Sequence, residues 1–333
     1  KNAAAARNCS WCCTTLHHQN PAPSGRSIVA WVSCTMPKDK KEAHVPVRSL
    51  KTRDSLVYCT FDALENKKYV ASGEFADVYL AKWNHRNVAV KILKEKYRGQ
   101  EGPNFDFDAE KEILAKLPSF PGIVKMYSNG EHQELPFMVL ECLGDTLSQR
   151  MYRSSKALPW TVVFDFAKQL ASTMKYLHSE AVKGHTVLHR DLKPDNIMFD
   201  ETGSTLKLVD FGLVCVVNQA TNSAKKSANQ AGLDGSSSAK IDGETLLDLT
   251  GRTGSLRYMA PEVAGNKPYN EKAEVYTWAI ILWEMTVRER PYTGLNPTKF
   301  VEYVMDRGYR PDLKHKRCKQ WPPEIHDLVA NCF

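Results

Sequence analysis

The chain has 333 residues, of which 42% are hydrophobic and 25% are charged, a composition typical of a folded globular protein with a sizeable core. The formal net charge of +7 lies mostly in residues 1–58, which hold nine Lys and Arg against three Asp and Glu and so carry +6. Because the remaining residues are close to neutral, they offer no broad basic surface, and we expect no nucleic-acid binding. The longest apolar stretch near the start, residues 28–32, is far shorter than the roughly 20 residues of a membrane span, so no span is expected.

Residues 1–58 are predicted to be a disordered basic leader, since they are rich in Ala, Asn, Ser, Pro and Lys without a period of 2 or 3.6. One folded domain is predicted over residues 59–333. The sequence starts with Lys1 and not with Met, so we expect a further segment before it in the natural protein. The nine cysteines are irregularly spaced, which predicts reduced thiols and an intracellular, cytoplasmic protein.

The first half of the domain is predicted to consist of β-strands around one helix. Two β-rich runs, residues 78–80 and 88–93, are separated by a polar turn, and strand-like runs return over residues 122–142. Between them, apolar residues recur at helical spacing over residues 106–117, and the proline that follows ends the helix. A small antiparallel sheet with one helix is therefore expected.

The second half of the domain is predicted to be mainly helical. Apolar side chains fall on one helical face over residues 160–178, and residues 274–285 form a second predicted helix. Between these helices, residues 218–243 contain almost nothing large and apolar to bury, which predicts a disordered insert.

Three short motifs in this half are the strongest chemical signal of the sequence. His-Arg-Asp-Leu-Lys-Pro-Asp-Asn occupies residues 189–196, Asp-Phe-Gly follows a predicted strand at residues 210–212, and Ala-Pro-Glu occupies residues 260–262. Transfer of a phosphoryl group from a nucleotide needs such groups, because both the nucleotide and the transferring group are anionic. All three motifs in this order are hard to produce by chance.

The residue types of these motifs suit phosphoryl transfer. Asp191 is placed to orient an acceptor hydroxyl and take its proton, and Lys193 to neutralise the transferring phosphate. Asn196 and Asp210 carry the hard oxygen ligands that magnesium prefers, and they form the predicted metal site. Lys91 closes a Val-Ala-Val-Lys strand, from which it can reach the α- and β-phosphates, and it joins Asp191 and Lys193 as a predicted catalytic residue.

The three motifs together resemble the signature set of the eukaryotic protein kinase family, and the resemblance covers residues 60–333. It implies an α+β, two-lobed protein kinase fold. The N-lobe, residues 59–143, would be a small antiparallel β-sheet with one regulatory helix, and the C-lobe, residues 144–333, would be larger and mainly helical. The insert over residues 218–243 would lie in the activation segment, and the cofactors would be ATP and Mg²⁺.

The resemblance places ATP in the cleft between the lobes, with its adenine against a hinge that includes Glu141 and Leu143. Glu110 is expected to pair with Lys91, since its E-x-x-I-L-x-x-L spacing matches the family's regulatory helix, although Glu112 is a close neighbour. The residues implied to bind the cofactor are Ala71, Gly73, Val78, Ala89, Lys91, Glu110, Glu141, Leu143, Asn196 and Asp210.

The sequence departs from the family pattern in two places. The loop that should read G-x-G-x-x-G has Ala71 and Ala76 at its outer positions, and only Gly73 survives. Because glycine lets backbone N–H groups approach phosphate, we expect a stiffer loop and poorer ATP binding without loss of catalysis. Glu274 replaces the family's aspartate that braces the catalytic loop, and its longer side chain must shift the hydrogen-bond geometry.

Two segments indicate the acceptor. Lys193 and the run at residues 254–262 resemble serine/threonine kinases, and residues 258–285 are similar to the tyrosine-kinase-like group. We therefore expect a protein serine/threonine kinase whose partner is a protein substrate with a Ser or Thr acceptor. The alternatives left open are an ATP-binding pseudokinase scaffold, favoured by Ala71, Ala76 and Glu274, and a dual-specificity kinase.

Regulation by an upstream activating kinase is expected from Arg190, whose guanidinium suits a phosphate on the activation segment. The candidate acceptors are Thr245, Thr250 and Thr253. The sequence ends where the family continues into a helix with the arginine that pairs with Glu262. We therefore expect Glu262 to lack this partner and the chain to be incomplete at both ends.

Overall fold

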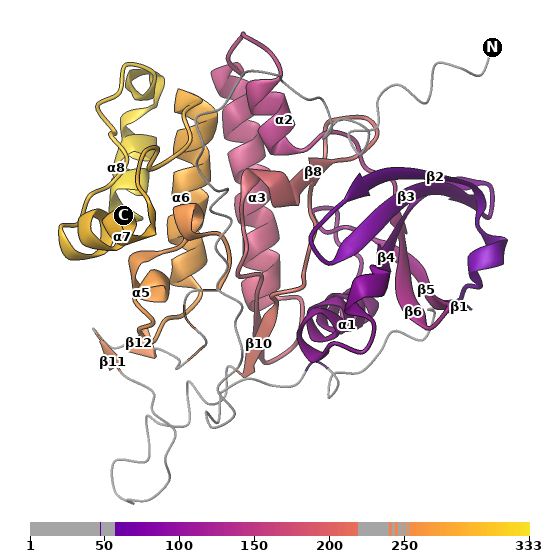
Figure 1. Cartoon of the computed structure of the whole chain (residues 1–333). Coiled ribbons are helices and arrows are strands. Elements are labelled where there is room, and N and C mark those ends of the chain that lie inside the picture. Colours follow the sequence, from indigo (N-terminus) through magenta and orange to yellow (C-terminus); the bar gives the residue numbers. More distant parts are fainter. Residues whose placement is uncertain are drawn as a thin grey trace, which may run out of the picture.

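The protein has two lobes, one built on a β-sheet and one mainly helical (Figure 1). The residues that the computed structural model describes are 47, 57–218, 240–241, 244–245, 249, 251 and 253–333. Within these ranges, no helix is both long enough and apolar enough to cross a membrane. The predicted two-lobed α+β fold is confirmed.

The N-lobe is a six-stranded sheet with the strand order β1-β5-β6-β4-β3-β2. Its strands are β1 (Val57–Tyr58), β2 (Glu65–Ser72), β3 (Ala76–Trp83), β4 (Arg86–Leu93), β5 (Met126–His132) and β6 (Leu135–Glu141). All neighbouring strands are antiparallel except β1, which runs parallel to β5. Strand β1 falls in the segment predicted as leader, so the sheet begins before residue 59.

Two hairpins of this sheet turn on pairs of residues with positive φ. Asn84 and His85, with φ of 48° and 62°, join β3 to β4. Gln133 and Glu134, with φ of 50° and 64°, join β5 to β6. Two-residue turns with positive φ match the right-handed twist of the flanking strands, although glycine and asparagine adopt them most easily. The polar turn predicted between the β-rich runs at residues 78–80 and 88–93 is therefore only two residues long.

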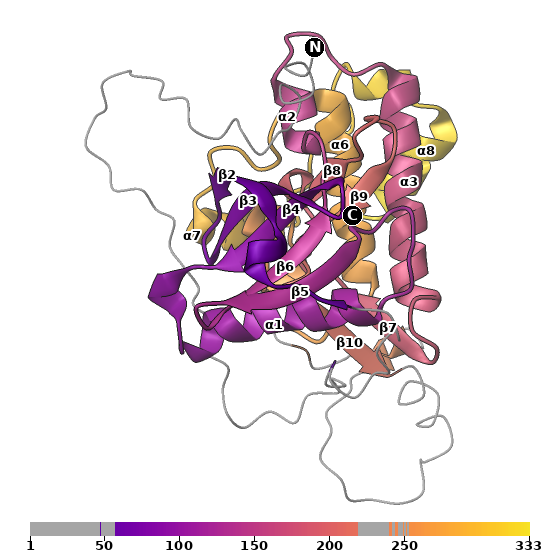
Figure 2. The same cartoon turned by 90° about the vertical axis from the view of Figure 1, so that its right-hand side faces the viewer.

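Helix α1 (Glu101–Lys116) runs along the sheet, below β5 in the view of Figure 2. It begins before residue 106, its predicted start, because Gly102 and Pro103 stand in the first turn, where N–H groups have no helical partner and proline is tolerated. Ile113 and Leu114 of the helix are fully or almost fully buried. The helix is thereby fixed against the sheet.

Strand β4 has different neighbours on its two faces. Ala89 and Leu93 belong to the main core together with α1, whereas Val88, Val90 and Ile92 belong to a second, smaller cluster. Because side chains alternate along a strand, the residue between Val90 and Ile92 faces α1. That residue is Lys91.

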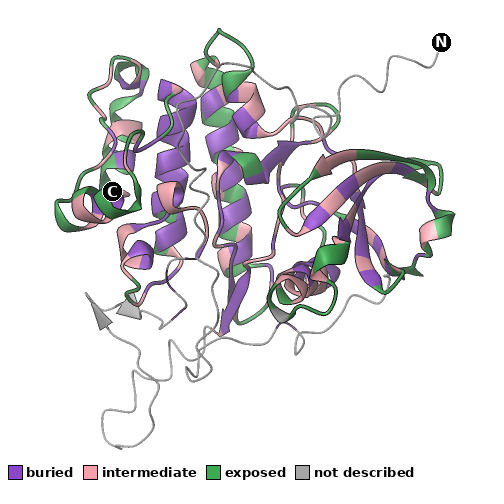
Figure 3. Cartoon of the chain, in the orientation of Figure 1, coloured by how far each residue is buried: buried purple, intermediate pink, exposed green. Residues whose placement is uncertain are grey.

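The C-lobe is built around α6 (Lys272–Val287), which is buried along almost its whole length (Figure 3). Helix α3 (Trp160–Ser179) packs beside it, and Trp278 Nε1 donates to the carbonyl oxygen of Ala167 at 2.9 Å. The other α-helices are α2 (Leu147–Tyr152), α5 (Pro261–Ala264), α7 (Pro297–Phe300) and α8 (Pro323–Asn331). Short helical turns are η4 (Phe61–Ala63), η5 (Glu95–Tyr97), η6 (Pro194–Asn196), η7 (Leu256–Tyr258), η8 (Val301–Asp306) and η9 (Cys318–Gln320).

Three short antiparallel strand pairs complete the described part of the fold. They are β7 (His185–Leu188) with β10 (Cys215–Asn218), β8 (Ile197–Phe199) with β9 (Leu206–Leu208), and β11 (Lys240–Ile241) with β12 (Glu244–Thr245). Strand β11 and the last residue of β10 fall in the predicted insert, of which residues 219–239 and 242–243 lie outside the described residues.

Gly130 of β5 allows a close approach that a side chain would block. A Cβ at this position would lie 2.1 Å from the backbone oxygen of Cys59 and 2.7 Å from the ring of Phe137. We therefore expect Gly130→Ala to lower the free energy of unfolding, measured by urea denaturation, by about 1–3 kcal/mol.

The matched control for this substitution is Gly102→Ala in α1. A Cβ at Gly102 would meet nothing within 4 Å, and alanine is favoured over glycine inside a helix by about 0.5–1 kcal/mol. The control should be as stable as the parent or more stable. Equal stability of the two variants would contradict the expected clash at Gly130.

Candidate active site

Two strand pairs bring the motifs of the C-lobe together. Strand β7 leads into residues 189–196, and β9 leads into Asp210. The register of β8 against β9 places Asn196 and Asp210 at the same end of that pair. His189 joins the two motifs, because its Nε2 lies 3.1 Å from the carbonyl oxygen of Val209.

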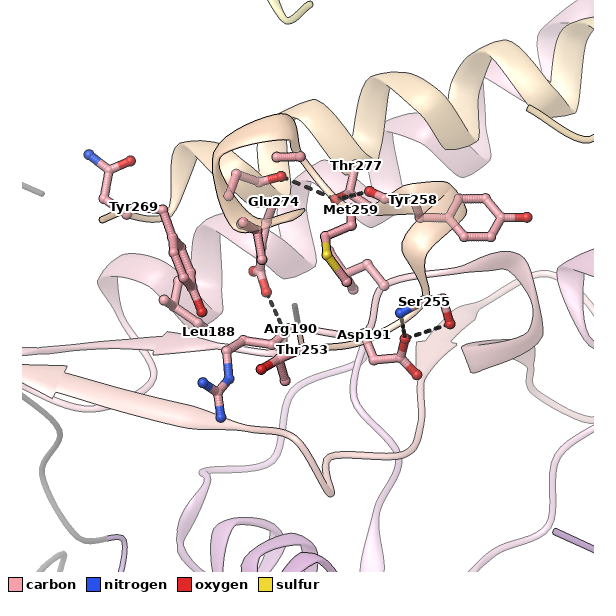
Figure 4. A pocket seen from close by; sticks show the side chains of 15 residues that line it. Leu188, Arg190, Asp191, Thr253, Ser255, Tyr258, Met259, Tyr269, Glu274 and Thr277 are labelled. Atoms are coloured by element: carbon pink, nitrogen blue, oxygen red, sulfur yellow. Dashed lines mark hydrogen bonds between the residues drawn. The ribbon is translucent and has the colours of Figure 1, made fainter. Parts of the chain in front are cut away.

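Asp191 is held by four donors. Its Oδ1 accepts hydrogen bonds from the backbone N–H of Ser255 at 2.9 Å and from the Ser255 hydroxyl at 2.8 Å (Figure 4). Its Oδ2 lies 2.6 Å from Lys193 Nζ and accepts from Asn196 Nδ2 at 3.0 Å. These bonds fix the orientation of a buried carboxylate, as a group that positions and deprotonates a hydroxyl requires.

Lys193 bridges the catalytic loop and the segment that precedes α5. Its ammonium contacts Asp191 and donates to the Ser255 hydroxyl at 3.1 Å. Burial, the largest single effect, lowers the pKa of Lys193, but the carboxylates of Asp191, Asp210 and Asp195 together outweigh it and raise the pKa above its usual value. The side chain therefore stays positively charged at neutral pH.

Lys91 joins three elements of the molecule. Its Nζ lies 2.5 Å from Glu110 Oε2 of α1 and 3.1 Å from Asp210 Oδ1. Burial alone would lower the pKa of Lys91, but the two carboxylates raise it above its usual value. The structure thus pairs Lys91 with Glu110 and not with Glu112, because Glu110 is buried under the sheet while Glu112 is partly exposed.

Asn196 and Asp210 present two oxygen ligands for a divalent cation. The Asn196 amide nitrogen donates to the backbone oxygen of Asp191 at 2.9 Å, so its amide oxygen points elsewhere. The Lys91 ammonium lowers the pKa of Asp210 although burial acts in the opposite direction, which keeps this carboxylate ionised at neutral pH. Two hard oxygen ligands, one of them charged, fit a cation that fills its remaining positions with water and phosphate.

Arg190 and Asp210 both adopt positive φ, at 65° and 66°. This conformation is uncommon for residues other than glycine and persists only where the surroundings hold it. The backbone N–H of Arg190 donates to Glu274 Oε1 at 2.7 Å, and its Nε donates to the carbonyl oxygen of Leu213 at 2.6 Å. The catalytic loop is therefore held on both sides of Arg190.

Glu274 of α6 anchors the loop through both of its carboxylate oxygens. Oε1 accepts from the Arg190 backbone (Figure 4), and Oε2 lies 2.6 Å from His178 Nε2 of α3. The glutamate thus reaches the loop as predicted for the bracing residue.

A cavity of about 30 Å³ lies between residues 188–192, residues 253–260 and α6. It has room for a water molecule or two but not for a nucleotide.

The apolar residues predicted to contact the nucleotide lie on the sheet and at the hinge. Val78, Ala89 and Leu143 are buried in the main core, which extends from the N-lobe into the C-lobe. Ala71 pairs with Val78 across β2 and β3, and Gly73 follows in the turn between these strands. Ala71, Gly73 and Val78 therefore lie at one end of the β2–β3 hairpin.

The side chain of Glu141 is occupied within the protein. Its Oε1 accepts from the backbone N–H of Lys125 at 2.6 Å and lies 2.8 Å from Lys207 Nζ of β9. This carboxylate thus ties Glu141 to the strand that leads into Asp210. The backbone N–H of Glu141 is also used within the protein, since it donates to the carbonyl oxygen of Lys125 at 2.9 Å.

Residues 64–333 match the family described as the protein kinase domain. The chain belongs to the protein kinase family. Membership of this family implies ATP and usually a divalent metal.

Several curated relatives are similar to this kinase domain. "Serine/threonine-protein kinase VIK" of Arabidopsis thaliana is 30% identical over 270 residues, which cover 80% of this chain and 55% of the relative. "Mitogen-activated protein kinase kinase kinase 7" of Drosophila melanogaster is 28% identical, covering 83% and 35%, and that of Homo sapiens is 27% identical, covering 82% and 39%. The chain thus spans about half the length of these relatives or less. They confirm a kinase domain of the serine/threonine type.

Two residues of the site, Ser255 and His178, were not predicted from the sequence. Ser255 contacts both Asp191 and Lys193, and His178 contacts Glu274. Ser255 stands in the run that indicated a serine/threonine kinase, but its contact with Asp191 spans 64 residues of sequence. No local spacing predicts such a contact.

The proposed regulatory residues lie in different surroundings. Thr253 is buried, with its hydroxyl 3.4 Å from the carbonyl oxygen of Gly251, so another kinase would reach it only if the segment opened. The side chain of Thr245 and all of Thr250 lie outside the described residues. Glu262 is partly exposed and has no ion pair among the residues that the structure describes.

The buried carboxylate of Glu274 makes stability depend on pH. Burial alone would raise its pKa, but the bonds with His178 and the Arg190 backbone outweigh burial and lower the pKa below its usual 4.5. Since the pKa is lower in the folded chain, the ionised carboxylate stabilises the fold above pH 4.5, and this stabilisation is lost as the pH falls through the folded pKa.

We expect Glu274→Gln to lower the free energy of unfolding by about 1–3 kcal/mol near neutral pH, measured by urea denaturation. The difference from the parent should shrink as the pH falls below 4.5. The control is Glu289→Gln, because Glu289 lies 3.9 Å from His315 on the surface and should contribute at most about 1 kcal/mol. A loss that does not change with pH would argue against the ionised bridge.

Proposed function

We propose that this domain is an active protein serine/threonine kinase that transfers the γ-phosphoryl group of Mg²⁺-ATP to Ser or Thr hydroxyls of a protein substrate. The observation that carries the proposal is the Asp191 carboxylate, held between Ser255 and Lys193. A carboxylate fixed by donors on both oxygens can receive an acceptor hydroxyl in one orientation, which is the main requirement of phosphoryl transfer.

In the proposed reaction, the acceptor hydroxyl donates its proton to Asp191 as its oxygen forms a bond to the γ-phosphorus. The bond between the γ-phosphorus and the oxygen that bridges to the β-phosphate breaks, and ADP leaves. Lys193 stabilises the charge on the transferring group, and Lys91 orients the α- and β-phosphates. Asn196 and Asp210 would hold Mg²⁺, which neutralises phosphate charge when bound.

The pseudokinase reading is less well supported by the geometry. A scaffold that signals by shape does not need its lysine, helix glutamate and metal-binding aspartate in contact, yet Lys91 reaches both Glu110 and Asp210. Ala71 and Ala76, which stand where the family has glycine, are the observation that favours the pseudokinase alternative.

Transfer of labelled γ-phosphate to a mixed peptide library with Ser, Thr or Tyr acceptors tests the proposal. Label should appear on Ser or Thr, and Asp191→Asn should reduce the rate by about 10²–10⁴-fold while ATP still binds, because the general base is lost. Asp306→Asn, an exposed aspartate of the C-lobe, is the charge-matched control and should keep the parent rate. Label on Tyr as well would indicate dual specificity, and a folded, ATP-binding protein without transfer would favour the scaffold.

We further propose that the kinase acts in a reducing intracellular compartment under an upstream activating kinase. The nine cysteines of the sequence are irregularly spaced, which supports a reducing environment. Thr245 and Thr250 are the proposed phosphorylation sites, because Thr253 is buried.

A further inference from the structure

The turn between β2 and β3 is fastened to the segment that follows β4. The backbone N–H of Gly73 donates to the carbonyl oxygen of Ala76 at 2.8 Å, which closes the turn. The backbone N–H of Lys94 donates to the carbonyl oxygen of Phe75 at 2.9 Å, and the Phe75 ring packs edge-on against Tyr97 at 5.4 Å. This turn is the loop in which the protein kinase family has three glycines and this chain keeps only Gly73.

Three polar side chains reinforce this attachment, and we call Ser72, Asp77 and Lys94 the loop clamp. The Lys94 ammonium donates to the carbonyl oxygen of Gly73 and lies 3.9 Å from Asp77 Oδ1. The same Asp77 oxygen accepts from the Ser72 hydroxyl at 2.7 Å. Asp77 thus holds both the end of β2 and the ammonium that binds the tip of the turn.

The loop clamp lies on the face of the sheet that is turned away from Lys91. Ala76 and Val78 of β3 belong to the main core on the α1 side, so Asp77, between them, faces the opposite side. The Lys94 ammonium must share that side to approach Asp77. The carbonyl oxygen of Gly73 is therefore drawn toward the outer face of the sheet.

The orientation of this carbonyl determines where the next N–H group points. In a trans peptide unit, C=O and N–H point in opposite directions. If the Gly73 carbonyl is drawn to the outer face, the N–H of Glu74 is turned toward the cleft face, where the Lys91 ammonium lies. A backbone N–H in this position suits a phosphate oxygen, as in other anion-binding turns.

We infer that Lys94 is a positioning residue that orients the Glu74 N–H toward the terminal phosphates of the nucleotide. The loop clamp supplies by side-chain contacts the geometry that flanking glycines would otherwise allow. The inference rests on the proposed function only for the presence of ATP in the cleft, so binding tests it without any need for phosphoryl transfer.

The experiment compares equilibrium binding of Mg²⁺-ATP and of adenosine, which has no phosphate, to the full chain and its variants. Lys94→Met and Asp77→Ala should each weaken Mg²⁺-ATP binding by about three- to tenfold, the effect of one lost hydrogen bond, while adenosine binding stays within about twofold. Unchanged adenosine binding also shows that the variants are folded. Lys82→Met, which removes an exposed lysine of β3, is the control and should leave both affinities unchanged.

The Asp77 variant separates positioning from simple charge attraction. Removal of a carboxylate near the phosphates should tighten ATP binding if only long-range charge matters, whereas it should weaken binding if Asp77 holds Lys94 in place. Tighter or unchanged ATP binding by Asp77→Ala, or unchanged binding by Lys94→Met, would overturn the inference. Loss of phosphoryl transfer with intact ATP binding would count against the proposed function alone.

Discussion

The shared contact of Lys91 with Glu110 and Asp210 is the interaction on which the organisation of this kinase domain depends. The Lys91 ammonium lies within hydrogen-bond distance of Glu110 on α1 and of Asp210, which follows β9. A buried charge is tolerated only when it is paired, so a shift of α1 would leave the lysine with one carboxylate fewer and Glu110 without its cation. The tilted contact of the His189 and Phe211 rings, with centroids 4.7 Å apart, extends this coupling into residues 189–196. The position of α1 is therefore linked energetically to the geometry around Asp191.

Helix α6 provides the fixed base for that geometry. Because it is buried on nearly all sides, it cannot move without disruption of the C-lobe core, and its Glu274 transmits this rigidity to the catalytic loop. Ser255 adds a second attachment from the segment before α5. The carboxylate of Asp191 is thus positioned by contacts with two separate parts of the C-lobe, which explains how an otherwise strained residue such as Arg190 is kept in place.

The parts of the fold that the sequence predicted are those with a strong local signal. The helix around residues 160–178 carries apolar periodicity, residues 274–285 form a mostly apolar run, and the motif residues are contiguous in sequence. Strand β1 has two exposed residues and β2 is mostly exposed and charged, so neither shows a hydrophobic alternation. The turn at Gln133 and Glu134 lacks the glycine that normally marks it. The contacts of Ser255 with Asp191 and of Lys94 with Gly73 depend on tertiary placement, and no pattern along the chain specifies them.

The two edges of the N-lobe sheet are protected in different ways. At one edge, β1 covers β5, and at the other, β2 carries Glu65, Lys67 and Lys68 on an exposed strand. Lys67 also reaches back to the carbonyl oxygen of Leu64 at 2.6 Å and lies over the ring of Phe61. Charged edge strands resist pairing with a second sheet, because the lysines would have to give up water. Strand addition by another copy of the chain is therefore disfavoured at the β2 edge, and at the opposite edge the two residues of β1 offer only a very short strand for pairing.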